Sequence, residues 1–200
     1  MRLSGERYET IKGTIADFFE DYDIKTTPID VLEIARKMNI VVVFSSSLIK
    51  KHPRKIGEYQ RHVFPNSFVC FDENIKKFVM YIDDIGTSKK RQRFSIAHEL
   101  AHIILNHEKQ SSLNESEANF AATYILAPSS LVLLIPNEVQ LLSENLIQRV
   151  FYVSKPESKI IKRRFLERAS LTSFRAKHYE KRINELLKED FIEKIHAPPE

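Results

Sequence analysis

The clearest chemical signal in this sequence comes from two histidines at positions i and i+4. They are His98 and His102, in the run His98-Glu99-Leu100-Ala101-His102. If the run is helical, both imidazoles lie on one face, one turn apart, and can bind the same metal ion. Glu99 is offset around the helix, where it can accept a proton from a water molecule that the metal activates. The pattern therefore predicts a metal-dependent hydrolase with Glu99 as its general base.

Zinc is the metal that this donor set predicts, and a catalytic zinc site usually has a third protein ligand and an open position. The helix expected to begin near Ser112 offers two candidates, Glu115 and Glu117. We expect Glu117 to be the ligand because it lies on an apolar face, an unusual place for an unpaired carboxylate. Glu115 is the alternative, although it also has capping-box spacing from Ser112 or could orient a ligand histidine. The other residues on the Glu117 face are Leu113, Phe120, Ala121 and Tyr124.

The sequence around the motif resembles the ImmA/IrrE family of metallopeptidases. The resemblance rests on three segments in the family's order: residues 91–102, Glu117 to Ala122, and Leu126-Ala127-Pro128. It implies a zinc site formed by the two histidines and the glutamate before Ala-Asn, which is Glu117 here, with Glu99 catalytic. It also implies a substrate class, a helix-turn-helix repressor of a phage or mobile element, cleaved at one or a few sites.

The elements that must position these residues predict an α+β fold. We expect a small antiparallel sheet packed on a buried helix from about Ser88 to Asn106, which together form a zincin-like core. The apolar pattern of that helix covers nearly every side in its second half, as in helices buried in a core. Its expected strands are residues 40–44, 67–71 and 77–82, and the segment 45–66 is expected to be loop-rich. Further helices are expected at residues 5–22, from Pro28 with Thr27 as cap, from Ser112 to just before Pro128, and at 138–151, 155–169 and 175–195.

The chain is expected to divide near residue 130. Residues 1–130 would form the zincin-like metallopeptidase domain, and residues 131–200 a helical C-terminal region. Within that region, the helices on either side of Val153-Ser154 look like a helix-turn-helix-like element, also a feature of the family. Its second helix carries Lys155, Lys159 and Arg163, which could meet DNA phosphates. We favour the alternative, a packing helix with a solvated basic face, so DNA contact is possible but not expected.

Composition indicates a folded intracellular protein. The 200 residues are 42% apolar and carry a net charge of +4, which permits an acidic partner without requiring one. Cys70 is the sole cysteine, so no internal disulfide can form, and its apolar neighbours predict a buried thiol. The sequence shows neither a signal-peptide pattern nor an apolar run near the roughly 20 residues that span a bilayer. We therefore expect a cytoplasmic protein without membrane contact.

These observations favour a zinc metallopeptidase over two rivals that lack catalysis. The rivals are a regulator that binds DNA through a structural metal site and a module that sequesters a repressor without cutting it. Neither needs a glutamate at position 99, whereas the hydrolase does. The group that stabilises the developing oxyanion is not identified by the pattern, and Tyr124, Tyr59 and His62 are candidates by residue type alone.

Overall fold

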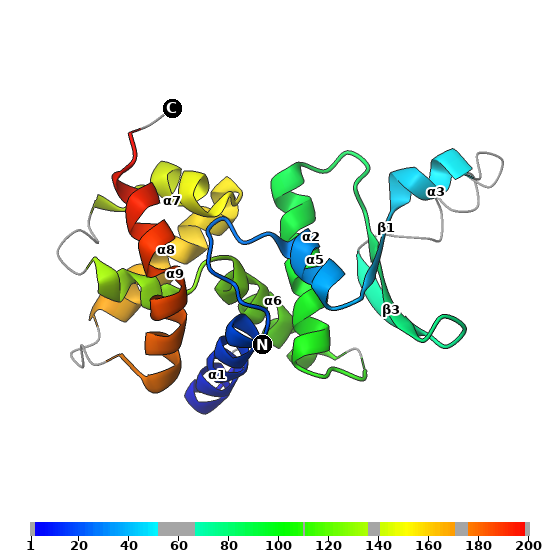
Figure 1. Cartoon of the computed structure of the whole chain (residues 1–200), viewed down its shortest axis with the longest axis horizontal. Coiled ribbons are helices and arrows are strands. Elements are labelled where there is room, and N and C mark those ends of the chain that lie inside the picture. Colours follow the sequence, from blue (N-terminus) through cyan, green and yellow to red (C-terminus); the bar gives the residue numbers. More distant parts are fainter. Residues whose placement is uncertain (1–2, 52–66, 110, 136–140, 171–175, 199–200) are drawn as a thin grey trace.

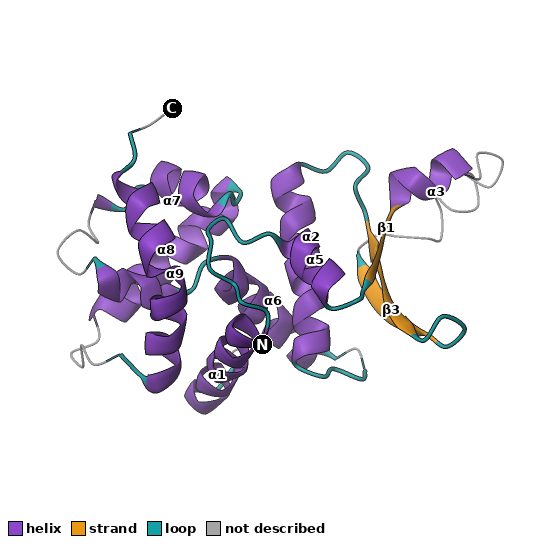
Figure 2. Ribbon diagram, viewed as in Figure 1, coloured by secondary structure: helices purple, strands orange, loops and turns teal. Residues whose placement is uncertain are grey.

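The computed structural model describes residues 3–51, 67–109, 111–135, 141–170 and 176–198. Figure 2 shows mostly helices around a small sheet, which confirms the α+β class. In Figure 1 the sheet lies towards one end of the molecule and the C-terminal helices towards the other. The elements are α1 (Gly5–Asp21), α2 (Val31–Lys37), β1 (Val41–Phe44), α3 (Ser45–Lys51), β2 (Phe68–Asp72), β3 (Lys77–Ile82), α5 (Lys89–Ile104), α6 (Ser112–Leu126), the 3-10 helix η2 (Ser129–Leu134), α7 (Glu144–Phe151), α8 (Lys155–Ser170) and α9 (His178–His196).

The sheet is mixed, which corrects the expected antiparallel arrangement. Its order is β1-β3-β2. β2 and β3 pair antiparallel, with Phe68 opposite Tyr81, and the short turn between them allows that direction. β1 pairs with β3 in parallel, with Val41 opposite Val79. A parallel pair needs a crossover connection, and the chain between β1 and β3 includes α3 and β2.

Helix α5 lies between the sheet and α6 and contacts both (Figure 1). It begins after Ser88, whose hydroxyl accepts a hydrogen bond from the backbone N–H of Arg91 at 3.2 Å. Such a cap satisfies one of the unpaired N–H groups at the start of a helix. The buried side chains of α5 include Ile96, Ala97 and Leu100. This burial on several sides of the helix agrees with its nearly all-round apolar pattern.

Three local expectations differ from the structure. α2 is capped by Asp30 rather than Thr27, because Thr27 donates from its backbone N–H and hydroxyl to Asp190 of α9, at 2.6 and 2.5 Å. α3 occupies the first seven residues of the segment expected to be a loop, and residues 52–66 lie outside the described part of the chain. Cys70 is exposed rather than buried, as is its neighbour Phe71, since β2 is the last strand on its side of the described sheet.

The C-terminal helices pack back onto the N-terminal part of the chain. α9 contacts α1 and η2, and α8 contacts η2. Arg93 of α5 adds polar links, donating to the backbone oxygens of Ile29, Phe151 and Tyr152 at 2.6 to 2.8 Å. The predicted helix-turn-helix-like element falls on α7 and α8, which are separated by residues 152–154. Its relation to DNA, and the division of the chain near residue 130, stay predictions.

Within the described part of the chain, one helical stretch is long and apolar enough to cross a membrane by length and composition alone. It runs over Ser112–Leu134 and includes α6 and η2, and 83% of its most apolar window is buried inside the protein. Core helices of soluble proteins meet the same criterion when they are buried in this way. The burial of this stretch therefore supports a role in the core.

Candidate metal centre

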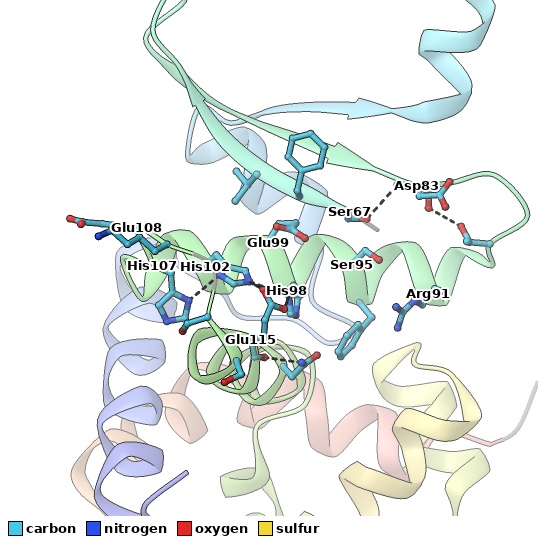
Figure 3. Close-up of a pocket in the computed structure, with 18 residues that line it drawn as sticks. Ser67, Asp83, Arg91, Ser95, His98, Glu99, His102, His107, Glu108 and Glu115 are labelled. Atoms are coloured by element: carbon cyan, nitrogen blue, oxygen red, sulfur yellow. Dashed lines mark hydrogen bonds and ion pairs between the residues drawn. The ribbon is translucent and has the colours of Figure 1, made fainter. Parts of the chain in front are cut away.

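α5 and α6 bring two histidines and one glutamate to a single point. His98 and His102 lie one turn apart on α5, and their Nε2 atoms are 3.1 Å from each other. Glu115 approaches from α6, with its two carboxylate oxygens 3.2 Å from Nε2 of His98 and 3.5 Å from Nε2 of His102. Figure 3 shows these three side chains turned towards one another. All three potential ligand atoms lie within 4.8 Å of one another.

The separations among these atoms fit a tetrahedral metal ion. Zinc is bound at about 2.0 to 2.2 Å by histidine nitrogen and carboxylate oxygen, so adjacent corners of its tetrahedron lie about 3.3 Å apart. The observed separations of 3.1, 3.2 and 3.5 Å scatter around this value. Three donors of this kind supply one face of the tetrahedron and leave the fourth corner for water or substrate. The residues present therefore fit a catalytic zinc ion.

Glu115 is the glutamate that meets the histidines, whereas Glu117, the expected third ligand, is paired with Arg7; which of the two binds a metal stays a prediction. The cap of α6 explains part of the difference, because Ser111 rather than Ser112 is the N-cap and accepts from the N–H of Asn114 at 3.0 Å. Glu115 then lies one position beyond the capping-box position and has no role at the helix end. Its carboxylate remains available to the cleft, with 45% of the side chain exposed.

Glu117 has different partners on the buried side of α6. Its side chain is 2% exposed, and its two oxygens accept hydrogen bonds from Nε and Nη2 of Arg7 in α1, at 2.6 and 2.5 Å. One of them also lies 3.1 Å from Nε2 of His107, just beyond the end of α5. The apolar face on which Glu117 lies was read correctly, but the guanidinium of Arg7 provides its counter-charge.

The two α5 histidines are held in their neutral form. Burial, together with the neighbouring His98 and His107, lowers the pKa of His102 to about 4 against the opposite effect of Glu115. Burial also lowers the pKa of His98, while Glu115 acts in the opposite direction. Neutral imidazole is the form that binds a metal. Both side chains can therefore serve as ligands near neutral pH without first losing a proton.

Glu99 lies on a different face of α5 from the two histidines. It lies on the side of α5 that faces β2, whereas His98 and His102 face α6 (Figure 3). Its residue is 4% exposed. Burial raises the pKa of Glu99 to about 8, the carboxylate of Glu115 adds to this, and a hydrogen bond from the backbone of Val69 acts against it. A carboxyl group with a pKa near neutral is suited to accept and return a proton.

A cleft of about 780 Å³ opens over these residues, which is within the usual size range of ligand pockets. Strand β2 forms one wall through Phe68 and Val69, and Glu115 and Asn119 of α6 form another. Among the candidates for oxyanion stabilisation, Tyr124 is 1% exposed and does not line the cleft, and Tyr59 and His62 lie outside the described residues. The lining also includes Ser67, Asp83, Thr87, Arg91, Phe94, Ser95, His98, Glu99, His102, His107, Glu108, Lys109, Ser111 and Ser112.

Sequence reasoning missed His107 as part of this centre. From its place after the motif helix, we expected it to interact with the helix dipole. Instead its Nδ1 lies 3.0 Å from Nδ1 of His102. The spacing of five residues from His102 was the available signal, because a chain leaving the helix there can turn back over the last turn. No local signal pointed to Arg7, which is 110 residues from its partner.

Comparison with known proteins identifies the family. The model of a peptidase family described as the IrrE N-terminal-like domain matches residues 35–157. The match covers more than half of the 200 residues and includes both α5 and α6. The chain therefore belongs to this family, as the resemblance implied. A search of curated proteins finds no match.

Proposed function

We propose that this member of the IrrE N-terminal-like peptidase family is a zinc-dependent metallopeptidase that hydrolyses peptide bonds. The observation that carries the proposal is the triangle of His98, His102 and Glu115 beside a buried Glu99, in a cleft large enough for a peptide segment. A structural zinc site normally has four protein ligands, whereas a catalytic site keeps one position open. Three donors facing a cleft favour the catalytic kind.

In this proposal the metal ligands are His98, His102 and Glu115, with Glu115 replacing the Glu117 of our initial prediction. When bound, a zinc ion acts as a Lewis acid that polarises a scissile carbonyl and makes water acidic enough to react. The two imidazoles and the carboxyl group of Glu115 would together hold one divalent ion. Glu115 belongs to α6 and the two histidines to α5, so the packing of α6 on α5 sets the distances between the three side chains.

Glu99 moves the protons of the reaction. Its carboxylate accepts a proton from the attacking water and then donates that proton to the nitrogen of the leaving amine, so that one group serves both halves of the hydrolysis. The elevated pKa of about 8 reflects burial, and a cation beside the carboxylate would lower it towards neutral. The backbone of Val69 also acts on the Glu99 carboxyl group and opposes the rise of its pKa, in keeping with its position beside β2.

The substrate peptide is proposed to lie along β2. In the described sheet β2 is the last strand on its side, since the order is β1-β3-β2. Phe68 and Val69 of this strand line the same cleft as Glu99 and His98. An extended peptide can add to a strand edge through main-chain hydrogen bonds, while side-chain pockets provide selectivity. This mode would place the scissile bond between the edge of β2 and the metal ligands.

We further propose that the substrate is a helix-turn-helix repressor of a phage or mobile element and that cleavage takes place in the cytoplasm. Family membership supports this substrate class through the resemblance described above, and no contact in the structure selects it independently. The alternative function is a regulator that binds a repressor or DNA without catalysis and uses the metal only as a structural element. The two functions differ in their need for Glu99.

The decisive experiment compares wild-type protein with Glu99→Gln in zinc content and in cleavage of a purified helix-turn-helix repressor. We expect about one zinc per chain in both proteins, with cleavage lost only in the variant, because the amide cannot accept a proton. Glu185→Gln, at an exposed position of α9 that does not line the cleft, is the matched control and should cleave normally. Cleavage by the zinc-loaded Glu99 variant would refute the mechanism, and a stable uncleaved complex with the wild type would favour the alternative.

A further inference from the structure

We infer that Arg7, Glu117 and His107 form a hydrogen-bonded relay that orients the metal ligand His102, which makes helix α1 part of the support of the metal centre. The inference rests on the zinc site proposed above. It assigns positioning roles to three residues, of which Arg7 lies outside the segment that matches the family. The relay runs from α1 through α6 and the end of α5 to the ring nitrogen of His102 that faces away from the metal.

Each residue of the relay contacts the next one through side-chain polar atoms. Arg7 binds both carboxylate oxygens of Glu117 at 2.6 and 2.5 Å. The Oε2 atom of Glu117 lies 3.1 Å from Nε2 of His107, and Nδ1 of His107 lies 3.0 Å from Nδ1 of His102. Nε2 of His102 then faces His98 and Glu115. Each link lies within hydrogen-bonding distance.

The proton positions along the relay follow from the metal end. A metal ion takes the lone pair on Nε2 of His102, so the proton of that neutral ring must be on Nδ1. This N–H donates to Nδ1 of His107, which places the proton of His107 on its Nε2, from where it donates to Glu117. The carboxylate of Glu117 accepts this bond as well as the two bonds from Arg7. Every donor therefore has an acceptor, and only one tautomer of His102 fits the sequence of bonds.

Because two members of the relay are buried, the loss of one hydrogen-bond partner would leave a polar group unpaired inside the protein. The side chains of His107 and Glu117 are 5% and 2% exposed. An isolated buried carboxylate would be strongly unfavourable, and the guanidinium of Arg7 prevents this by pairing with both oxygens. The carboxylate of Glu117 is thereby kept in place as the outer partner of His107, 3.1 Å from its Nε2. Partners of this kind fix the ring orientation of ligand histidines and raise their basicity.

Helix α1 supplies the fixed end of the relay. It contacts α6, α5 and α9, and Tyr8, next to Arg7, packs edge-on against Phe120 of α6 with ring centres 4.5 Å apart. This packing holds the Arg7 backbone in place relative to Glu117. A displacement of α1 would break two charge-assisted hydrogen bonds and release His107 and then His102. The metal affinity of the centre is therefore coupled to the seating of an N-terminal helix.

The test measures the zinc dissociation constant by competition with a chromophoric chelator for wild type, Glu117→Gln, Arg7→Met and Arg36→Met. We expect zinc affinity to fall about 10- to 100-fold in Glu117→Gln, the usual effect of losing an outer partner of a ligand, and to fall less in Arg7→Met. Arg36→Met is the matched control, because Arg36 also binds both oxygens of a glutamate, Glu33, but does so on the surface of α2. Its zinc affinity should equal that of the wild type. The visible spectrum of the cobalt-loaded protein should change in the two relay variants and stay constant in the control.

The outcomes separate the relay from other roles. Unchanged zinc affinity in Glu117→Gln and Arg7→Met, even with lower thermal stability, would overturn the relay and leave only a structural ion pair. Tighter zinc binding in Arg7→Met would also overturn it, since this would identify Glu117 as a ligand that Arg7 normally withholds. A wild type that binds no zinc would remove the proposed metal centre and the relay with it. Arg7 is 41% exposed, so Arg7→Met decides the matter even if Glu117→Gln does not fold.

Discussion

Shortening Glu115 by one methylene group tests the assignment of the third ligand most directly. The variant Glu115→Asp keeps the charge but withdraws the carboxylate by about 1.5 Å, the length of one carbon–carbon bond. The present separations of 3.2 and 3.5 Å from the two histidine nitrogens would then approach roughly 5 Å, beyond the roughly 3.3 Å edge of a zinc tetrahedron. Helix α6 cannot easily shift to compensate, because Ala118 and Ala121 are fully buried.

We expect zinc affinity to fall in Glu115→Asp by more than the roughly 100-fold that loss of an outer partner causes at most. Competition with a chromophoric chelator measures the change, and elemental analysis after gel filtration gives the stoichiometry. Glu108→Asp removes the same methylene group at an exposed residue on the cleft rim and should bind zinc like the wild type. Wild-type affinity in Glu115→Asp would refute the reasoning, because it would show that the metal does not depend on this carboxylate.

Three further predictions concern the scaffold around the centre. Leu100→Ala, at a fully buried position of α5, should lower the free energy of unfolding in urea by about 2 to 5 kcal/mol. Glu180→Ala should cost about 3 to 5 kcal/mol in the same assay, because it leaves the 8% exposed Arg168 without its bidentate partner at 2.7 Å. Burial raises the pKa of Glu9, but hydrogen bonds led by that from Lys177 outweigh it and lower the pKa to about 2, so the stability from this group is full above pH 4.5 and lost as the pH falls towards 2. Glu9→Gln should therefore reduce the difference in melting temperature between pH 6 and pH 3, and an equal difference in both proteins would contradict this assignment.

The local parts of the fold were predictable from the sequence because local physics decides them. Strand β3 begins and ends at the predicted residues, 77 and 82. This segment is a short apolar run that is bounded on both sides by turn residues. The motif helix was predicted within two residues of its observed ends, Lys89 and Ile104. Its start follows from a serine cap, which is a local hydrogen bond. The spacing of His98 and His102 places both on one face in any α-helix, so this pair needed no tertiary information.

The third ligand could not be predicted with the same security, because a contact between distant parts of the chain bears on it. The guanidinium of Arg7 reaches Glu117 from 110 residues away in the chain and removes the reason for expecting a metal there. A local misreading added to this, since the N-cap of α6 is Ser111 rather than Ser112 and Glu115 is not its capping-box partner. Burial of a carboxylate indicated correctly that it had a partner, but it did not indicate which partner. The direction of β1 depends in the same way on the crossover after it, which no pattern within the strand encodes.

The exposed thiol of Cys70 gives this protein a natural attachment point for a reporter. It is the only cysteine in the chain and is free and exposed on β2, the strand that supplies a wall of the cleft through Phe68 and Val69. A maleimide fluorophore would therefore label a single known site without any engineered substitution. Its emission would report on events at this strand in real time, so the arrival and departure of a peptide could be followed separately from the cutting step.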